Sequence, residues 1–129
     1  MDFAKRELIV EGTTAKPGQT RHVQLNSQAL NVLQDWSKQS SGEHVFPSPI
    51  TGERFNNIKK SWEGLRNRAG LKDFRFHDLR HSFASKLVMA QVDLYTVKEL
   101  MGHSTIQMTE RYAHLAPEHK ASAVEKIVS

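Results

Sequence analysis

Apolar residues recur at spacings of three and four through most of the chain after residue 26, which places them on one face of successive helices. We predict a helix that has Ser27 as its N-cap and runs to about Gln39, helices over residues 55–69 and 78–90, and a short helix that Asp93 caps and Gly102 ends after Met101. A further helix capped by Ser104 follows, and a last one runs from Pro117 to about Ile127. The expected buried positions are Leu30, Leu33, Trp36, Phe55, Ile58, Trp62, Leu65, Leu79, Phe83, Leu87 and Val88. A mainly helical chain is the expectation.

Two short runs near the N-terminus have the composition of strands. Glu7–Glu11 and Thr20–Leu25 are rich in apolar and β-branched residues, and Lys16-Pro17-Gly18-Gln19 supplies a turn between them. The pattern predicts a small antiparallel β-hairpin with Lys16 near its tip. Two strands alone are marginal in water, so the hairpin either packs on the helices or joins elements upstream of this chain.

The composition excludes several classes of protein. The 129 residues fit one domain, and no apolar run reaches the length of about 20 residues that a membrane span needs. The absence of cysteine excludes disulfides, thiolate zinc sites and thiol nucleophiles. Without a secretory signal at the N-terminus, the cytosol is the default location.

Positive charge is concentrated in one segment of the chain. The net charge is +4, yet nine basic residues against three acidic ones give the segment from Arg54 to Lys86 a charge of +6. A basic stripe of this kind can replace counterions along a phosphate backbone, although a solvated helix face is an equally plain explanation. We predict DNA contacts for Lys59, Lys60, Arg66, Arg75 and, further along, Arg111.

Three short motifs contain the residues suited to phosphate chemistry. In Phe76-His77-Asp78-Leu79-Arg80-His81, the side chains of His77 and Arg80 are neighbours on a helix, and arginine can grip two phosphate oxygens. In Leu100-Met101-Gly102-His103-Ser104, Gly102 allows a tight turn that presents His103. Arg111-Tyr112-Ala113-His114 follows, with Tyr112 on the helix that Ser104 begins. Taken singly, each motif is more simply explained as surface or packing residues.

Together and in this order, the three motifs resemble the tyrosine recombinase family, also called phage integrases. The likeness runs from about Glu7 to the end of the chain and includes the spacing between His103 and Tyr112. The strand Arg21-His22-Val23-Gln24-Leu25 also resembles the family's strand after its catalytic lysine, which matches Lys16. The resemblance implies a mainly helical partial catalytic domain with a small antiparallel sheet.

The resemblance also implies a mechanism and a set of roles. Tyr112 would attack a DNA phosphate to form a 3′-phosphotyrosyl link, Arg80 and His103 would stabilise the charged phosphate, and Lys16 would protonate the leaving 5′ oxygen. His77 would bond the phosphate or accept the tyrosine proton, because a phenol with a pKa near about 10 needs a base to attack at neutral pH. Neither a cofactor nor a metal is expected, since the covalent link keeps the energy of the phosphodiester.

One family feature does not match. The family's first catalytic arginine lies on a helix upstream of the hairpin, which this chain does not contain, and Arg6 lies too close to the strand to replace it. We therefore expect residues 1–129 to be the C-terminal portion of a catalytic domain whose upstream arginine helix and N-terminal DNA-binding domain are absent. The fragment alone would be weakly active or inactive.

The implied partner is double-stranded DNA in a bacterial nucleoid or phage, with no membrane. A tetramer on DNA is expected for the intact protein, and the fragment could be a monomer. Three alternatives stay open: a non-catalytic DNA-binding or assembly module with the same fold, a type IB topoisomerase-like enzyme, and a zinc pair formed by His77 and His81. The final helix, with Ala121, Val124 and Ile127 on one face, could pack on a neighbouring protomer or on its own domain.

Overall fold

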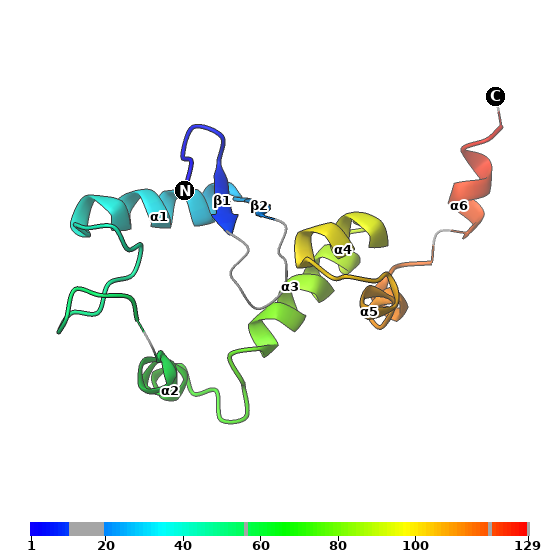
Figure 1. Cartoon of the computed structure of the whole chain (residues 1–129). Helices are drawn as coiled ribbons and strands as arrows, with labels where there is room; N and C mark the ends of the chain where they lie inside the picture. Colours follow the sequence, from blue (N-terminus) through cyan, green and yellow to red (C-terminus); the bar gives the residue numbers. More distant parts are fainter. Residues whose placement is uncertain (11–19, 56, 119, 129) are drawn as a thin grey trace. The chain divides into compact units, whose positions relative to one another are not determined.

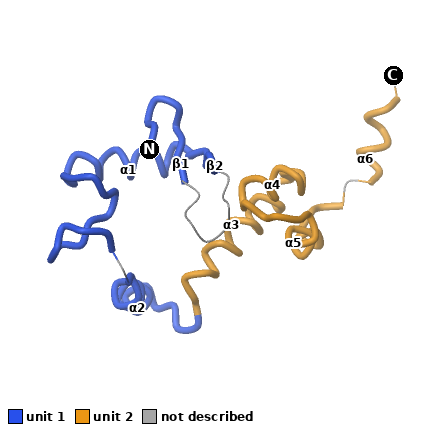
Figure 2. Tube along the Cα trace, in the orientation of Figure 1, with its two compact units in different colours: residues 1–73 blue, residues 74–129 orange. Residues whose placement is uncertain are grey.

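A computed structural model describes residues 1–10, 20–55, 57–118 and 120–128. The chain divides into two compact units, Met1–Asp73 and Phe74–Ser129, which Figure 2 colours separately. Across the described ranges, every helix is too short or too polar to cross a lipid bilayer.

The first unit contains the predicted hairpin. Strands β1 (Glu7–Val10) and β2 (Arg21–Gln24) pair antiparallel, with Glu7 opposite Gln24 and Val10 opposite Arg21 (Figure 1). The Glu7 carboxylate bonds both His22 and Gln24 across the ladder, at 3.0 and 2.6 Å, which helps to fix this register. The prediction of two antiparallel strands is confirmed, while the turn with Lys16 lies outside the described residues.

Helix α1 (Ser27–Gln39) has the bounds that its periodicity predicts. Its N-cap, however, is Asn26 and not Ser27, because the Asn26 side chain accepts a hydrogen bond from the Ala29 amide at 2.8 Å. The Trp36 indole N–H donates to the Val45 carbonyl and its ring lies 5.8 Å from that of Phe46, so the following loop folds back onto the helix.

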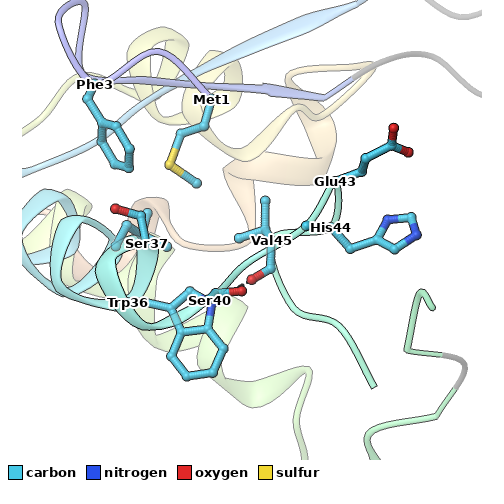
Figure 3. A pocket seen from close by; sticks show the side chains of 10 residues that line it. Met1, Phe3, Trp36, Ser37, Ser40, Glu43, His44 and Val45 are labelled. Carbon is cyan, nitrogen blue, oxygen red and sulfur yellow. Dashed lines mark hydrogen bonds between the residues drawn. The ribbon is translucent and has the colours of Figure 1, made fainter. Parts of the chain in front are cut away.

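A pocket of about 260 Å³ opens beside this helix (Figure 3). Met1 and Phe3 line it from the N-terminal segment, Trp36 from α1 and Val45 from the loop. Its lining includes none of the residues that the sequence motifs singled out, so the pocket carries no functional assignment.

Helix α2 (Lys59–Arg68) begins four residues later than predicted. The expected core positions Ile58 and Leu65 are largely exposed, and α2 contributes no fully buried residue. The prediction of a helix here is confirmed, but the prediction of a buried apolar face is wrong. Lys59 and Lys60 form the exposed first turn of this helix.

The second unit is built around a pair of helices and the segment that follows them. Helices α3 (Asp78–Met89) and α4 (Leu94–Met101) pack together and against the segment that follows them, and the resulting core consists of Ala84, Val88, Val97, Met101 and Tyr112. Figure 1 shows α3 and α4 crossing beside the short α5 (Gln107–Glu110). This small core includes the predicted nucleophile Tyr112 and also Met101, which lies two residues before His103.

The buried face of α3 differs from the predicted one. Ala84 and Val88 are fully buried and Leu87 packs against the core, whereas Leu79 and Phe83 are 45% and 47% exposed. Apolar residues lie on several sides of this helix, so their spacing alone is compatible with more than one buried face. The position of α4 decides that the Ala84 side is the buried one.

Glycine and aspartate fix the ends of α4 as predicted. The Asp93 carboxylate caps the Thr96 amide at 2.9 Å, and Gly102 adopts the left-handed conformation (φ 64°) that ends the helix. The next prediction is wrong, because no helix starts at Ser104 and carries Tyr112. Instead, α5 ends at Glu110, and Tyr112 precedes the short 3-10 helix η1 (Ala113–Leu115). The last helix, α6, spans only Lys120–Glu125.

Candidate active site

The N-terminus of α3 is held by an ion pair. The Arg75 guanidinium donates to the Asp78 carboxylate at 2.9 Å, and the Arg75 backbone N–H donates to the same group at 2.8 Å. These bonds hold the pKa of Asp78 below its ordinary value and raise that of Arg75. Asp78 thus anchors the start of the helix, beside the exposed imidazole of His77.

Arg80 links α3 to the turn that presents His103. Its guanidinium donates a short hydrogen bond to the Met101 carbonyl, two residues before His103. This bond orients the planar fork of the guanidinium, which is the group that can hold two oxygens of an anion. The side chain is half-buried, so its charge is less screened than that of a surface arginine.

His103 is a buried histidine in a positive environment. Its side chain is 8% exposed, and Nδ1 lies 2.8 Å from the hydroxyl of the fully buried Thr109. Burial first, and then the charges of Arg80, Arg111 and Lys98, lower the pKa of His103 below its ordinary value. The ring is therefore neutral at pH 7. If Thr109 donates to Nδ1, the Nε2–H is the donor that His103 can offer to a ligand.

Tyr112 has a buried ring and a hydroxyl held by a histidine. The residue is 7% exposed and belongs to the core, while its hydroxyl lies 2.5 Å from Nδ1 of His81. The His81 ring in turn packs edge-on against His77, with ring centroids 5.0 Å apart. Packing of the ring thus fixes the position of the hydroxyl oxygen.

These contacts bring four of the five predicted catalytic residues into one neighbourhood. His77 reaches Tyr112 through His81, while Arg80 reaches the His103 turn through Met101, and Met101 and Tyr112 share one core. Lys16, the fifth, lies outside the described residues. Their catalytic roles stay predictions at this point.

The predicted DNA-binding residues are divided between the units. Lys59, Lys60 and Arg66 lie on α2 in the first unit, whereas Arg75 and Arg111 belong to the second. Lys59, Lys60 and Arg111 are exposed, and Arg75 is held by Asp78. The Nε of Arg66 is buried and has no hydrogen-bond partner among the described residues.

Three residues that complete this arrangement were not predicted as site residues. His81 was considered only as a zinc partner of His77, yet its Nδ1 faces the tyrosine hydroxyl. Thr109 and Lys98 had no signal, because their relation to His103 depends on how α4 and α5 pack. In the described part of the chain, no three potential metal ligands come together.

We expect the lowered pKa of His103 to make folding stability depend on pH. The folded chain holds this ring neutral and binds fewer protons than the unfolded chain, so the contribution is present above the ordinary pKa of about 6.5 and is lost as the pH falls below it. Urea unfolding between pH 8 and pH 5 should therefore show a weaker pH dependence in His103→Gln than in the unsubstituted chain. Identical pH dependence in both proteins would contradict the assignment.

Comparison with known proteins identifies the family to which the chain belongs. The profile of the Phage integrase family matches residues 1–119. The integrase of Salmonella phage P22 is 34% identical over 143 residues, covering 100% of this chain and 36% of that protein. This chain therefore spans about a third of the length of that relative.

Solved structures agree with the sequence match. The catalytic domain of bacteriophage HP1 integrase has a TM-score of 0.66 and 31% identity, covering 94% of this chain and 64% of that chain. The XerH site-specific recombinase, in a post-cleavage complex with a palindromic difH substrate, has a TM-score of 0.67 over 93% of this chain and 36% of its own. At 24% identity, that second likeness concerns the fold alone. The chain, with a fold matching part of such catalytic domains, belongs to the phage integrase family of tyrosine recombinases.

Proposed function

We propose that residues 1–129 form the C-terminal portion of a longer catalytic domain that performs site-specific DNA recombination on a mobile element. The reaction would cut and rejoin double-stranded DNA through a 3′-phosphotyrosyl link to Tyr112. One observation supports the proposal: the Tyr112 ring lies in the same small core as Met101, whose carbonyl accepts a hydrogen bond from Arg80. The Tyr112 hydroxyl is bonded by His81, whose ring packs against that of His77. Family membership supports the class of reaction.

Charge is the main obstacle in this chemistry, because negative charge develops on the phosphate oxygens in the transition state. Arg80 and the Nε2–H of His103 are proposed to donate to these oxygens, and the exposed His77 to contribute a third donor. Arg111 and Lys98 add positive charge around His103. Donors fixed in advance by Met101 and Thr109 need little reorganisation when the charge appears.

The cleavage step exchanges one phosphoester bond for another. The Tyr112 oxygen bonds the phosphorus as the bond to the 5′ oxygen breaks, and Lys16 is proposed to protonate the leaving oxygen. A 5′ hydroxyl from a second strand then attacks the phosphotyrosine and reverses the exchange. Because the phosphotyrosyl link conserves the energy of the diester, rejoining requires no external energy source.

Double-stranded DNA, in a bacterial nucleoid or phage, is the proposed partner. XerH, which shares the fold, is described as bound to its DNA substrate. Assembly of the intact protein as a tetramer on DNA is part of the same proposal. The exposed lysines of α2 supply the phosphate-binding charge of the first unit.

The double variant Lys59→Gln/Lys60→Gln is expected to bind duplex DNA with a weaker salt dependence. Each lysine that neutralises a phosphate contributes about 0.9 to the slope of log K against log salt, so the slope should fall by about 2. Fluorescence anisotropy over a salt series measures this slope. The matched control Lys5→Gln/Lys38→Gln removes two exposed lysines that pair with Asp2 and Asp35 and should leave the slope unchanged.

Formation of a covalent protein–DNA adduct tests the proposed function. The substrate would be a duplex that the longer protein selects from a random pool, with a nick placed beside the cleavage position. Cleavage then releases the short fragment that carries the free 5′ hydroxyl, so rejoining is prevented and the adduct accumulates. An SDS-resistant band supports the recombinase. Salt-sensitive binding without any adduct would instead indicate a non-catalytic DNA-binding module. The 129-residue chain by itself is expected to give a weak adduct or none.

A further inference from the structure

We propose that His81 is the base that accepts the proton of Tyr112 when the tyrosine attacks DNA. This inference rests on the proposed function and assigns a further catalytic residue to it. His81 touches the reacting oxygen directly, since its Nδ1 lies 2.5 Å from the Tyr112 hydroxyl. Such a contact is close enough for the phenol O–H to donate to the imidazole nitrogen.

The neighbouring candidates are less suited to this task. Arg80 has only donor groups and is bonded to the Met101 carbonyl. His103 has its Nδ1 engaged by Thr109. His77 packs its ring against the ring of His81 and is exposed, which suits a group that contacts DNA. Of the imidazoles at this site, His81 is the one bonded to the hydroxyl.

The geometry also selects a tautomer. A neutral His81 with its proton on Nε2 presents the lone pair of Nδ1 to the phenol, which is the arrangement that proton transfer requires. The ring of Tyr112 is fixed by the core, so the hydroxyl and Nδ1 are held together without help from the substrate.

Several charged or titratable groups surround this pair. His77 contacts the His81 ring from the start of α3, and Asp78 senses the charge of His81, which contributes to lowering the Asp78 pKa. On the other side, the Arg111 guanidinium lies 5.8 Å from the centre of the Tyr112 ring, and Arg80 immediately precedes His81 in the sequence. The cation at Arg111 favours a developing phenolate, which complements a base at His81.

The proton balance of the step is complete with this assignment. As the Tyr112 oxygen bonds phosphorus, its proton passes to Nδ1 of His81, and the 5′ oxygen that leaves takes a proton from Lys16, the proposed acid. On rejoining, the attacking 5′ hydroxyl bonds phosphorus and gives its proton to the now neutral amine of Lys16. The phosphotyrosine bond breaks at the same time, and Nδ1 of His81 returns its proton to the Tyr112 oxygen.

Two substitutions separate proton transfer from positioning. In the longer protein, His81→Asn keeps an acceptor near the place of Nδ1 but cannot take up a proton, while His81→Ala removes both functions. Single-turnover adduct formation on the nicked duplex should slow about 10²-fold in both variants. The control His114→Asn replaces an exposed histidine of η1 and should cleave at the unsubstituted rate.

The pH profile gives a readout that a purely structural role would not change. A base must be neutral to work, so the rate should fall toward acid pH in the unsubstituted protein, and this acid limb should be lost in His81→Asn. Cleavage by His81→Asn at the unsubstituted rate or faster, or with the same acid limb, would overturn the assignment. A faster rate would mean that the contact restrains the tyrosine.

A spectroscopic measurement tests the contact without DNA. With tyrosine labelled at the ring carbon that bears the hydroxyl, the signal of Tyr112 is identified by its disappearance in Tyr112→Phe. The chemical shift of this carbon should depend on pH in the unsubstituted protein and should no longer do so in His81→Asn. The same pH dependence in both proteins would overturn the inference. If the unsubstituted protein forms no adduct, the proposed function fails together with this inference, whereas a normal adduct in His81→Asn refutes the inference alone.

Discussion

The Tyr112→Phe variant of the longer protein is expected to form no covalent adduct with DNA while it keeps its fold. The substitution removes only the oxygen that would bond phosphorus, and the phenylalanine ring can fill the same place among Val88, Val97 and Met101. Losing the hydrogen bond to His81 should cost about 1 kcal/mol of stability. Denaturing electrophoresis after incubation with the nicked duplex measures the adduct, and urea unfolding measures the stability.

The chain contains a matched control for this substitution. Its second tyrosine, Tyr95, is 70% exposed on α4 and lies outside the described site. Tyr95→Phe should therefore form the adduct at the unsubstituted rate. An adduct that persists in Tyr112→Phe would identify another nucleophile and refute the proposed chemistry.

The Arg80→Gln variant is expected to cleave DNA about 10²- to 10³-fold more slowly, because removing one preorganised donor typically costs about 3 kcal/mol of transition-state stabilisation. Arg80→Lys should recover only part of this loss, since lysine keeps the charge but lacks the planar fork that can hold two oxygens. Binding to uncleaved duplex should change little, because Arg80 is one of several cations. Single-turnover cleavage and anisotropy together separate the two effects.

The control must show that the loss does not come from unfolding. Arg80 also donates to the Met101 carbonyl, so both variants lose part of the link between α3 and the His103 turn. Urea unfolding of each variant checks that the rate is measured on folded protein. Arg68→Gln, an exposed arginine on α2, serves as the matched substitution. Arg68→Gln should cleave DNA at the unsubstituted rate. If it cleaved slowly while it bound uncleaved duplex as well as the unsubstituted protein, the effect of Arg80→Gln would not be specific.

The ends of α4 are features that local sequence predicts well. They follow from apolar spacing together with Asp93 as the N-cap and a glycine at position 102, whereas at α1 the spacing predicts the helix but the cap is Asn26, one residue before the predicted Ser27. Such features depend on backbone groups only three or four residues apart, which a short sequence window contains. The predicted bounds were wrong around α2, where the N-cap residue makes no side-chain hydrogen bond, and before Tyr112, where the candidate cap Ser104 begins no helix.

Burial on α3 required the partner helix. Leu79, Phe83, Ala84 and Val88 are all apolar, and their order along the chain does not say which of them meets α4. The tertiary structure buries Ala84 and Val88 because α4 approaches on their side, with Val97 and Met101 filling the contact. A helix with apolar residues on more than one side is therefore ambiguous from its sequence.

The order of the motifs by itself determined the family and named Tyr112, Arg80, His77 and His103 as candidates, since each motif is a run of adjacent residues. Only the tertiary structure decided that His81, and not His77, bonds the Tyr112 hydroxyl, and that Thr109 holds His103. The physical reason is distance along the chain. His81 and Tyr112 are 31 residues apart, and packing of the segment after α4 against α3 sets which imidazole the hydroxyl meets.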